Sequence, residues 1–217
     1  MEHDNVVKIL KEICDIESND GIEFEYLGDS PIRKDDVYGG FSIILEGRLG
    51  NIKQRFDIDL ATGDIIYPKD NSYDYECLIT NEHIMLKSYS IESIVAEKLQ
   101  TFLYLGPFNS RSKDFYDLYI FKKLKINDEN LNMFKEAYKQ TCLRRNFVIS
   151  KENALINFNN VKNNQMQLKR WNSYSKKVKY AKKYFIWRIN EINWRIDKYY
   201  FIVLISCINN ILYCVNL

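Results

Sequence analysis

The chain contains few of the residues on which many enzymes depend. His3 and His83 are its only histidines, which disfavours catalysis by a histidine base and metal binding by a histidine cluster. Its eight glycines form neither a G-x-G-x-x-G pattern nor a P-loop, which excludes the common phosphate-binding loops. The five cysteines are far apart and include no C-x-x-C pair, so neither a disulfide framework nor a zinc site is expected.

Long apolar runs are also scarce. The longest, Phe201–Val215, falls short of the roughly 20 residues that a spanning helix needs, and Asn209 and Asn210 interrupt it. The first 16 residues are charged and amphipathic rather than a secretory signal. We therefore expect no membrane association and a cytoplasmic location.

The 217 residues are enough for one moderate domain or two small ones, and a net charge of +2 leaves any attraction for nucleic acid to local clusters. Apolar residues that alternate with polar ones predict three strands, at 21–29, 41–50 and 53–68. Helical periodicity predicts helices at 5–17, 90–106, from Asn109 or Ser110 to about 124, from Asn127 or Asp128 to 145, and at 170–185, with an asparagine-rich loop before the last. Strands followed by helices indicate an α+β fold.

Two neighbouring predicted helices place charge where a core is expected. Lys98 falls near the middle of a stripe formed by Ile91, Ile94, Val95, Leu99 and Phe102. On the next helix, Asp117 lies within the apolar face and Asp114 lies one turn earlier at its edge. Because only a short loop separates the helices, the lysine and one or both aspartates could meet.

Two interpretations of this meeting remain open from the residues alone. In the first, the charges form a buried structural ion pair that locks the two helices together. In the second, they form a site in which Lys98 holds a triphosphate and an aspartate orients the attacking hydroxyl.

Three ordered motifs resemble one known family. They are I-D-x-x-x-G-D at 58–64 followed by Pro68, E-x-x-x-A-E-K-L at 92–99, and N-S-R-x-K-D-x-Y-D at 109–117. Together they cover about Tyr38 to Leu124, and on them the chain is identified as a member of the AbiEii/AbiGii toxin family of nucleotidyltransferases. A weaker similarity continues to about residue 183.

The resemblance implies a partial polymerase-beta-like nucleotidyltransferase sheet followed by a helical C-terminal region. It implies a toxin of a type IV toxin–antitoxin or abortive-infection system for phage defence, with a cognate antitoxin as partner. The implied reaction uses an NTP and Mg²⁺ and adds nucleotides to an RNA such as tRNA. Carried over residue by residue, it makes Asp59 a metal-site carboxylate, Lys98 and Lys113 nucleotide contacts, and Asp114 or Asp117 the late catalytic acid.

Asp57 and Asp59 alternate onto one side of a predicted strand, as a pair of magnesium ligands would require. The alternative is that they are two exposed positions on a half-buried edge strand.

The family's first motif, a glycine turn followed by D-x-D, is not found ahead of Val37. Gly39-Gly40 followed by Asp57 and Asp59 imitates that motif, but the gap is too long and the continuation to Gly63-Asp64 fits the later strand better. We therefore expect an N-terminally truncated chain that could be inactive in this form. The predicted division is a partial nucleotidyltransferase region at 1–88, a helical region at 89–183 and a divergent tail at 184–217.

A basic run with interleaved aromatic residues follows, and it comprises Lys169, Arg170, Trp171, Tyr174, Lys176, Lys177, Lys179, Tyr180, Lys182 and Lys183. Such a run could track an RNA backbone, or it could be a solvated helix face beside a core contact. The sequence thus predicts a nucleotidyltransferase toxin, with a non-catalytic remnant that binds antitoxin or RNA as the alternative and a functionless gene fragment as a third reading.

Overall fold

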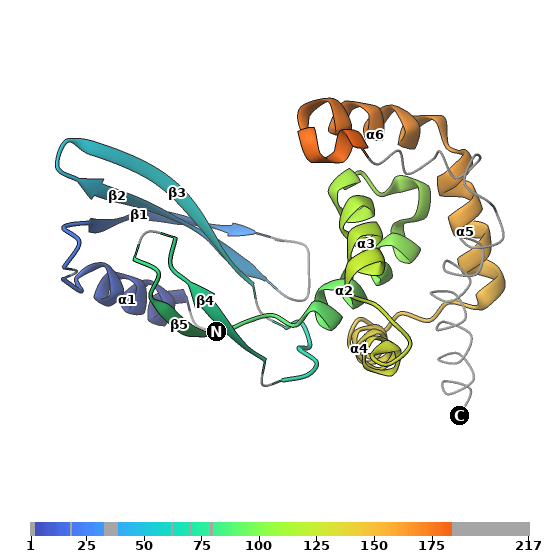
Figure 1. Cartoon of the computed structure of the whole chain (residues 1–217), viewed down its shortest axis with the longest axis horizontal. Coiled ribbons are helices and arrows are strands. Elements are labelled where there is room, and N and C mark those ends of the chain that lie inside the picture. Colours follow the sequence, from blue (N-terminus) through green and yellow to red (C-terminus); the bar gives the residue numbers. More distant parts are fainter. Residues whose placement is uncertain are drawn as a thin grey trace. The chain divides into compact units, whose positions relative to one another are not determined.

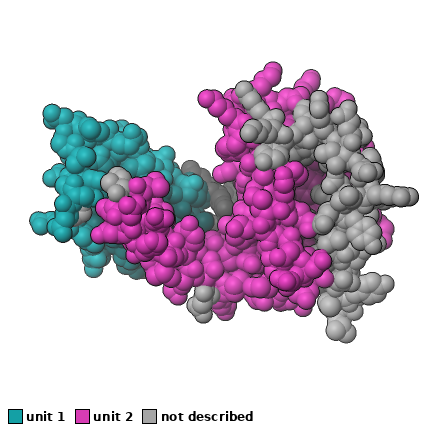
Figure 2. Space-filling model, in the orientation of Figure 1, with its two compact units in different colours: residues 1–64 teal, residues 65–217 magenta. Residues whose placement is uncertain are grey.

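The computed structural model describes residues 3–17, 19–32, 39–61, 63–69, 71–78 and 80–183. It divides into two compact units, residues 1–64 and 65–217 (Figure 2). The division between the two units lies between Asp64 and Ile65. The predicted tail at 184–217, with its apolar run Phe201–Val215, lies outside the described residues.

The first unit is one helix packed on an antiparallel sheet (Figure 1). Its elements are α1 (His3–Cys14), β1 (Glu23–Ile32), β2 (Gly40–Leu49) and β3 (Ile52–Ala61), and the strands lie in the order β1-β2-β3. Val6 and Leu10 of α1 are buried against Ile43 and Leu45 of β2. The structure confirms the helix and the first two strands that the periodicity predicts, whereas the third strand, predicted for 53–68, ends at Ala61.

The tight connection between β2 and β3 follows from Gly50. Its φ of 56° lies in the left-handed region, which glycine adopts without the steric penalty of a side chain. The turn pairs Leu49 with Ile52 and sets the register that brings Asp57 opposite Ile44 and Asp59 opposite Ser42. The predicted turn signal at Gly50–Asn51 is thereby confirmed.

The second unit begins with a two-stranded hairpin and continues as a helical bundle. The hairpin is β4 (Ser72–Glu76) with β5 (His83–Lys87), which the sequence analysis does not predict. The helices are α2 (Ile91–Leu105), η1 (Gly106–Phe108), α3 (Ser112–Leu124), α4 (Leu131–Arg144), α5 (Lys151–Asn163), α6 (Gln165–Lys177) and η2 (Lys179–Lys183). Sheets followed by helices confirm the α+β class.

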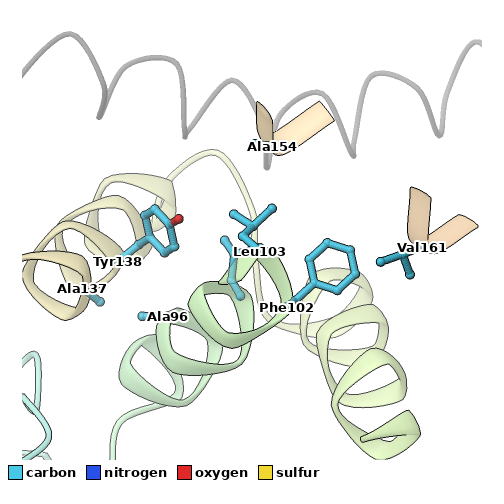
Figure 3. Close-up of a cluster of buried hydrophobic side chains, with 8 residues drawn as sticks. Ala96, Phe102, Leu103, Ala137, Tyr138, Ala154 and Val161 are labelled. Carbon is cyan, nitrogen blue, oxygen red and sulfur yellow. The ribbon is translucent and has the colours of Figure 1, made fainter. Parts of the chain in front are cut away.

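Helix α2 is central to the core of the second unit. Figure 3 shows Phe102 and Leu103 of α2 among Tyr138 of α4 and Ala154 and Val161 of α5, all of them buried. The Phe102 ring also makes an edge contact with Phe115 of α3, at 5.5 Å between ring centroids. Three helices are therefore held in place by one face of α2.

Helix α5 lies where the sequence analysis places an asparagine-rich loop, so that prediction is wrong. Ser150 caps the helix by accepting the backbone N–H of Asn153 at 3.2 Å. Ala154 and Val161 are fully buried, which stabilises a helix whose many asparagines have poor intrinsic propensity. Among the described residues, no helix is both long and apolar enough to cross a membrane.

We expect the contact between α1 and β1 to depend on pH. His3 Nε2 lies 2.8 Å from Asp29 Oδ1, and the hydrogen bonds with Asp29 and then Asp4 raise the pKa of His3 above its ordinary 6.5. A raised pKa means that the contact contributes fully below about pH 6.5 and is lost as the pH rises through the folded-state value.

An NMR titration of the His3 ring tests this contact. Asp29→Asn is expected to bring the pKa of His3 back toward 6.5, whereas Asp15→Asn, an exposed change near the end of the same helix, should leave it where it is. An unchanged His3 pKa in Asp29→Asn would show that the ion pair does not form in solution.

Candidate active site

The candidate site is built on the first half of α2, whose start is fixed by two buried serines. Ser90 Oγ accepts the backbone N–H of Ser93 at 3.1 Å and donates to the carbonyl of Tyr67 at 2.5 Å. This N-cap sets where the helix begins, and therefore which face carries each later residue. The predicted capping role of Ser90 is confirmed.

Lys98 meets both aspartates of α3. Its Nζ lies 2.5 Å from Asp114 Oδ1 and 2.8 Å from Asp117 Oδ2. All three side chains are largely buried, with 20% of Lys98, 13% of Asp114 and 18% of Asp117 exposed. The structure thus brings together the three charged residues that the helical patterns place on facing apolar surfaces.

The two carboxylates keep Lys98 charged. Burial alone would lower the pKa of this ammonium, but its hydrogen bonds with Asp114 and Asp117 and their negative charges together raise the pKa above the ordinary value. One positive and two negative charges leave the cluster with a surplus of negative charge at neutral pH. The cluster therefore places an ammonium, which can contact an anion, beside carboxylate oxygens, which can contact a cation.

The neighbouring motif residue Glu97 has a different role and connects α2 to the end of α4. Its carboxylate pairs with Arg145, the residue that follows α4, at 3.3 Å. The same carboxylate accepts a hydrogen bond from the Tyr89 hydroxyl. Arg145 also donates to Gln100 at 2.8 Å. These bonds fix α2 to the end of α4, and the sequence analysis misses them because the partners are 48 positions apart.

The loop between α2 and α3 is held by α6. The side-chain amide of Gln167 donates to the carbonyls of Pro107 and Asn109, both at 2.6 Å. The side chain of Asn109 accepts the backbone N–H of Arg111 just ahead of α3. The predicted cap at Asn109 or Ser110 is therefore displaced, since α3 begins at Ser112 with Arg111 in the capping position.

Three tyrosines lie near Asp117, one beside it on α3 and two from α6 and η2. The ring of Tyr116 lies 5.0 Å from that of Tyr180, and Tyr174 of α6 lies close to Tyr180, Asp117 and Tyr116. Burial is the main cause that raises the pKa of Tyr174, helped by the Tyr180 hydroxyl and the charge of Asp117. From the sequence, Tyr174 and Tyr180 are recognisable only as members of the basic run.

Asp57 and Asp59 lie in the first unit, on the exposed side of β3. Ile58 and Leu60, which alternate with them, pack on the opposite side into the core beneath α1. Two carboxylates on one side of a strand offer the oxygen ligands that Mg²⁺ prefers, and Mg²⁺ usually completes its shell with waters and substrate phosphates. Among the residues that the structure describes, no cluster of three or more metal-ligating side chains is found.

Two other residues singled out in the sequence, Lys113 and Gly40, lie outside the cluster of Lys98, Asp114 and Asp117. Lys113 is exposed in the first turn of α3. Gly40 is the first residue of β2, and a Cβ there would lie 2.4 Å from the Leu60 carbonyl oxygen. Gly40 is thus required by the close pairing of β2 with β3.

Comparison with known proteins gives one match. The model of a family described as the nucleotidyl transferase AbiEii toxin of type IV toxin–antitoxin systems matches residues 1–200. The matched range extends beyond the three sequence motifs in both directions and includes part of the predicted tail. No curated protein and no solved structure matches the chain.

Proposed function

Because the chain belongs to the AbiEii family of nucleotidyl transferase toxins, we propose that it transfers a nucleotidyl group from an NTP to an RNA acceptor such as a tRNA. The family is that of type IV toxin–antitoxin systems, so a cognate antitoxin is the expected protein partner. The proposed reaction is the toxic activity that this partner would oppose.

The observation that supports the proposal most directly is the contact of Lys98 with Asp114 and Asp117. Nucleotidyl transfer needs a cation to offset phosphate charge and a carboxylate to receive a proton. A purely structural pair needs one acid, whereas here two acids share one lysine. One carboxylate is enough to balance the charge of the ammonium, so the other carboxylate is available to receive a proton during the reaction.

The step itself breaks one bond and forms another. The oxygen of an RNA hydroxyl attacks the α-phosphorus of the NTP, and the bond from that phosphorus to the bridging oxygen breaks to release pyrophosphate. We assign Asp117, the slightly more exposed acid, as the group that takes the hydroxyl proton. Lys98 lies beside this carboxylate, so its ammonium is suited to contact the phosphates.

Asp57 and Asp59 are the residues that would hold Mg²⁺. When bound, the ion supplies a Lewis acid that neutralises phosphate charge. Their exposed position on β3 leaves room for the waters and phosphate oxygens that complete a magnesium shell.

The test is label transfer from α-labelled NTPs to total tRNA in the presence of Mg²⁺. We expect labelled RNA and released pyrophosphate, and we expect Asp59→Asn to raise the Mg²⁺ concentration needed for half-maximal rate by about tenfold. Asp128→Asn, an exposed acid ahead of α4, serves as the matched control and should transfer label normally.

A complete lack of transfer with every NTP would overturn the enzymatic proposal. The non-catalytic alternative, a module that binds antitoxin or RNA, would then be the better description. An unaltered Mg²⁺ requirement in Asp59→Asn would instead show that β3 does not bind the metal. That result would not contradict the proposed transfer reaction.

A further inference from the structure

The segment that contains α6 and η2 has an unusual charge balance. Between Glu152 and Glu191 the sequence has nine lysines and arginines and no acidic residue, so all 29 acidic residues of the chain lie elsewhere. The chain as a whole carries a net charge of only +2. The positive charge is therefore local, as expected of a surface that attracts a polyanion.

Four lysines of this segment face solvent. Lys169, Lys176, Lys177 and Lys179 are exposed, whereas Gln167 and Trp171 on the opposite side of α6 are buried. The buried side of the helix packs against α3 and holds the loop ahead of it through Gln167. The basic side is consequently fixed in place relative to Asp114 and Asp117 within the second unit.

An exposed aromatic ring of η2 follows Lys179 directly and lies beside Tyr116, the neighbour of Asp117. Tyr180 is 54% exposed, and its ring is tilted by 45° against that of Tyr116, the neighbour of Asp117 in the chain. Tyr174 of α6 is partly buried and lies close to Tyr180, Tyr116 and Asp117. A supported ring with a solvent-facing surface is suited to stacking with a nucleobase.

We propose that α6 and η2 form the binding surface for the single-stranded end of the RNA acceptor. The terminal base stacks on Tyr180, and the preceding phosphates follow Lys179, Lys177 and Lys176. The base on Tyr180 brings the end of the strand to Asp117, the group that takes the hydroxyl proton. This inference rests on the proposed function, because it names the acceptor site of that reaction.

The experiment measures binding of a labelled 12-nucleotide single-stranded RNA by fluorescence anisotropy, without NTP. Tyr180→Ala is expected to weaken binding by at least about fivefold, the lower range for one stacked base, while Tyr180→Phe keeps wild-type affinity. Tyr104→Ala, which removes a ring that is 68% exposed on α2, is the matched control and should bind normally. Thermal melting of each variant verifies that it is folded.

The charge contribution is tested by the salt dependence of the same binding. Lys176→Gln with Lys177→Gln should reduce the slope of log K against log salt by about 1.4, the value for two phosphate contacts with a single strand. Lys8→Gln with Lys11→Gln removes the same charge from α1 and should leave the slope unchanged.

Wild-type affinity in both Tyr180→Ala and the Lys176/Lys177 variant would overturn the inference. It would also be overturned if Tyr180→Ala weakened the binding of free NTP and left RNA binding intact, since the stacked base would then belong to the nucleotide. Because these measurements need no catalysis, a failure of label transfer alongside the expected binding would count against the proposed function only.

Discussion

Lys98→Met is expected to reduce label transfer by at least about 100-fold and to lower the free energy of unfolding by about 3 kcal/mol. The methionine keeps most of the side-chain length but leaves Asp114 and Asp117 facing each other without a cation. Both carboxylates are less than one-fifth exposed, so water can relieve only part of their repulsion. Urea unfolding followed by circular dichroism gives the stability, and transfer from labelled NTP gives the activity.

A triple variant separates the two interpretations of this cluster. Lys98→Met with Asp114→Asn and Asp117→Asn removes the repulsion, so it should regain most of the lost stability while it stays inactive. Because the pKa of Lys98 is raised, its stabilising contribution is present below its unfolded value of about 10.4 and is lost as pH rises through the folded value. Full activity in Lys98→Met would show that the ion pair is structural only.

Phe102→Ala is expected to destabilise the second unit by about 3 to 5 kcal/mol, because it leaves a cavity where three helices meet. Phe102 is 5% exposed, and its ring lies 5.5 Å from Phe115 and 6.5 Å from Phe158 between centroids. The loss should appear as a lower denaturation midpoint with an unchanged dependence on urea.

The chain offers a matched control for this cavity. Phe108 lies three residues beyond the end of α2 and is 85% exposed, so Phe108→Ala should change stability by no more than about 0.5 kcal/mol. Equal losses in the two variants would mean that the α2 core is not the main source of stability in this unit.

Local signals explain which parts of the fold could be predicted from the sequence. Ser90 and Gly106 mark the two ends of α2, since a serine cap and a glycine with φ of 49° act within a few residues of the helix. Helix α5 also has a serine cap, but its many asparagines obscure the helical spacing of the buried residues Ala154 and Val161. Its stability comes from packing against α2, which no local pattern contains.

The same distinction applies to the candidate site. Lys98 and Asp117 could be predicted to meet because each interrupts an apolar face on adjacent helices. The contacts of Glu97 with Arg145 and of Tyr116 with Tyr180 join residues 48 or more positions apart. Such contacts depend on how the helices pack, and single-sequence periodicity carries no information about that packing.

The hydrogen bonds of Gln167 to the Pro107 and Asn109 carbonyls have a consequence for how related chains can vary. The acceptors are backbone atoms, so a substitution at Pro107 leaves its acceptor in place, whereas an inserted or deleted residue would move both. Natural variation between α2 and α3 is therefore expected in residue identity rather than in loop length. A glutamine at the position of Gln167 should accompany a loop of this length, since the two features are useful only together.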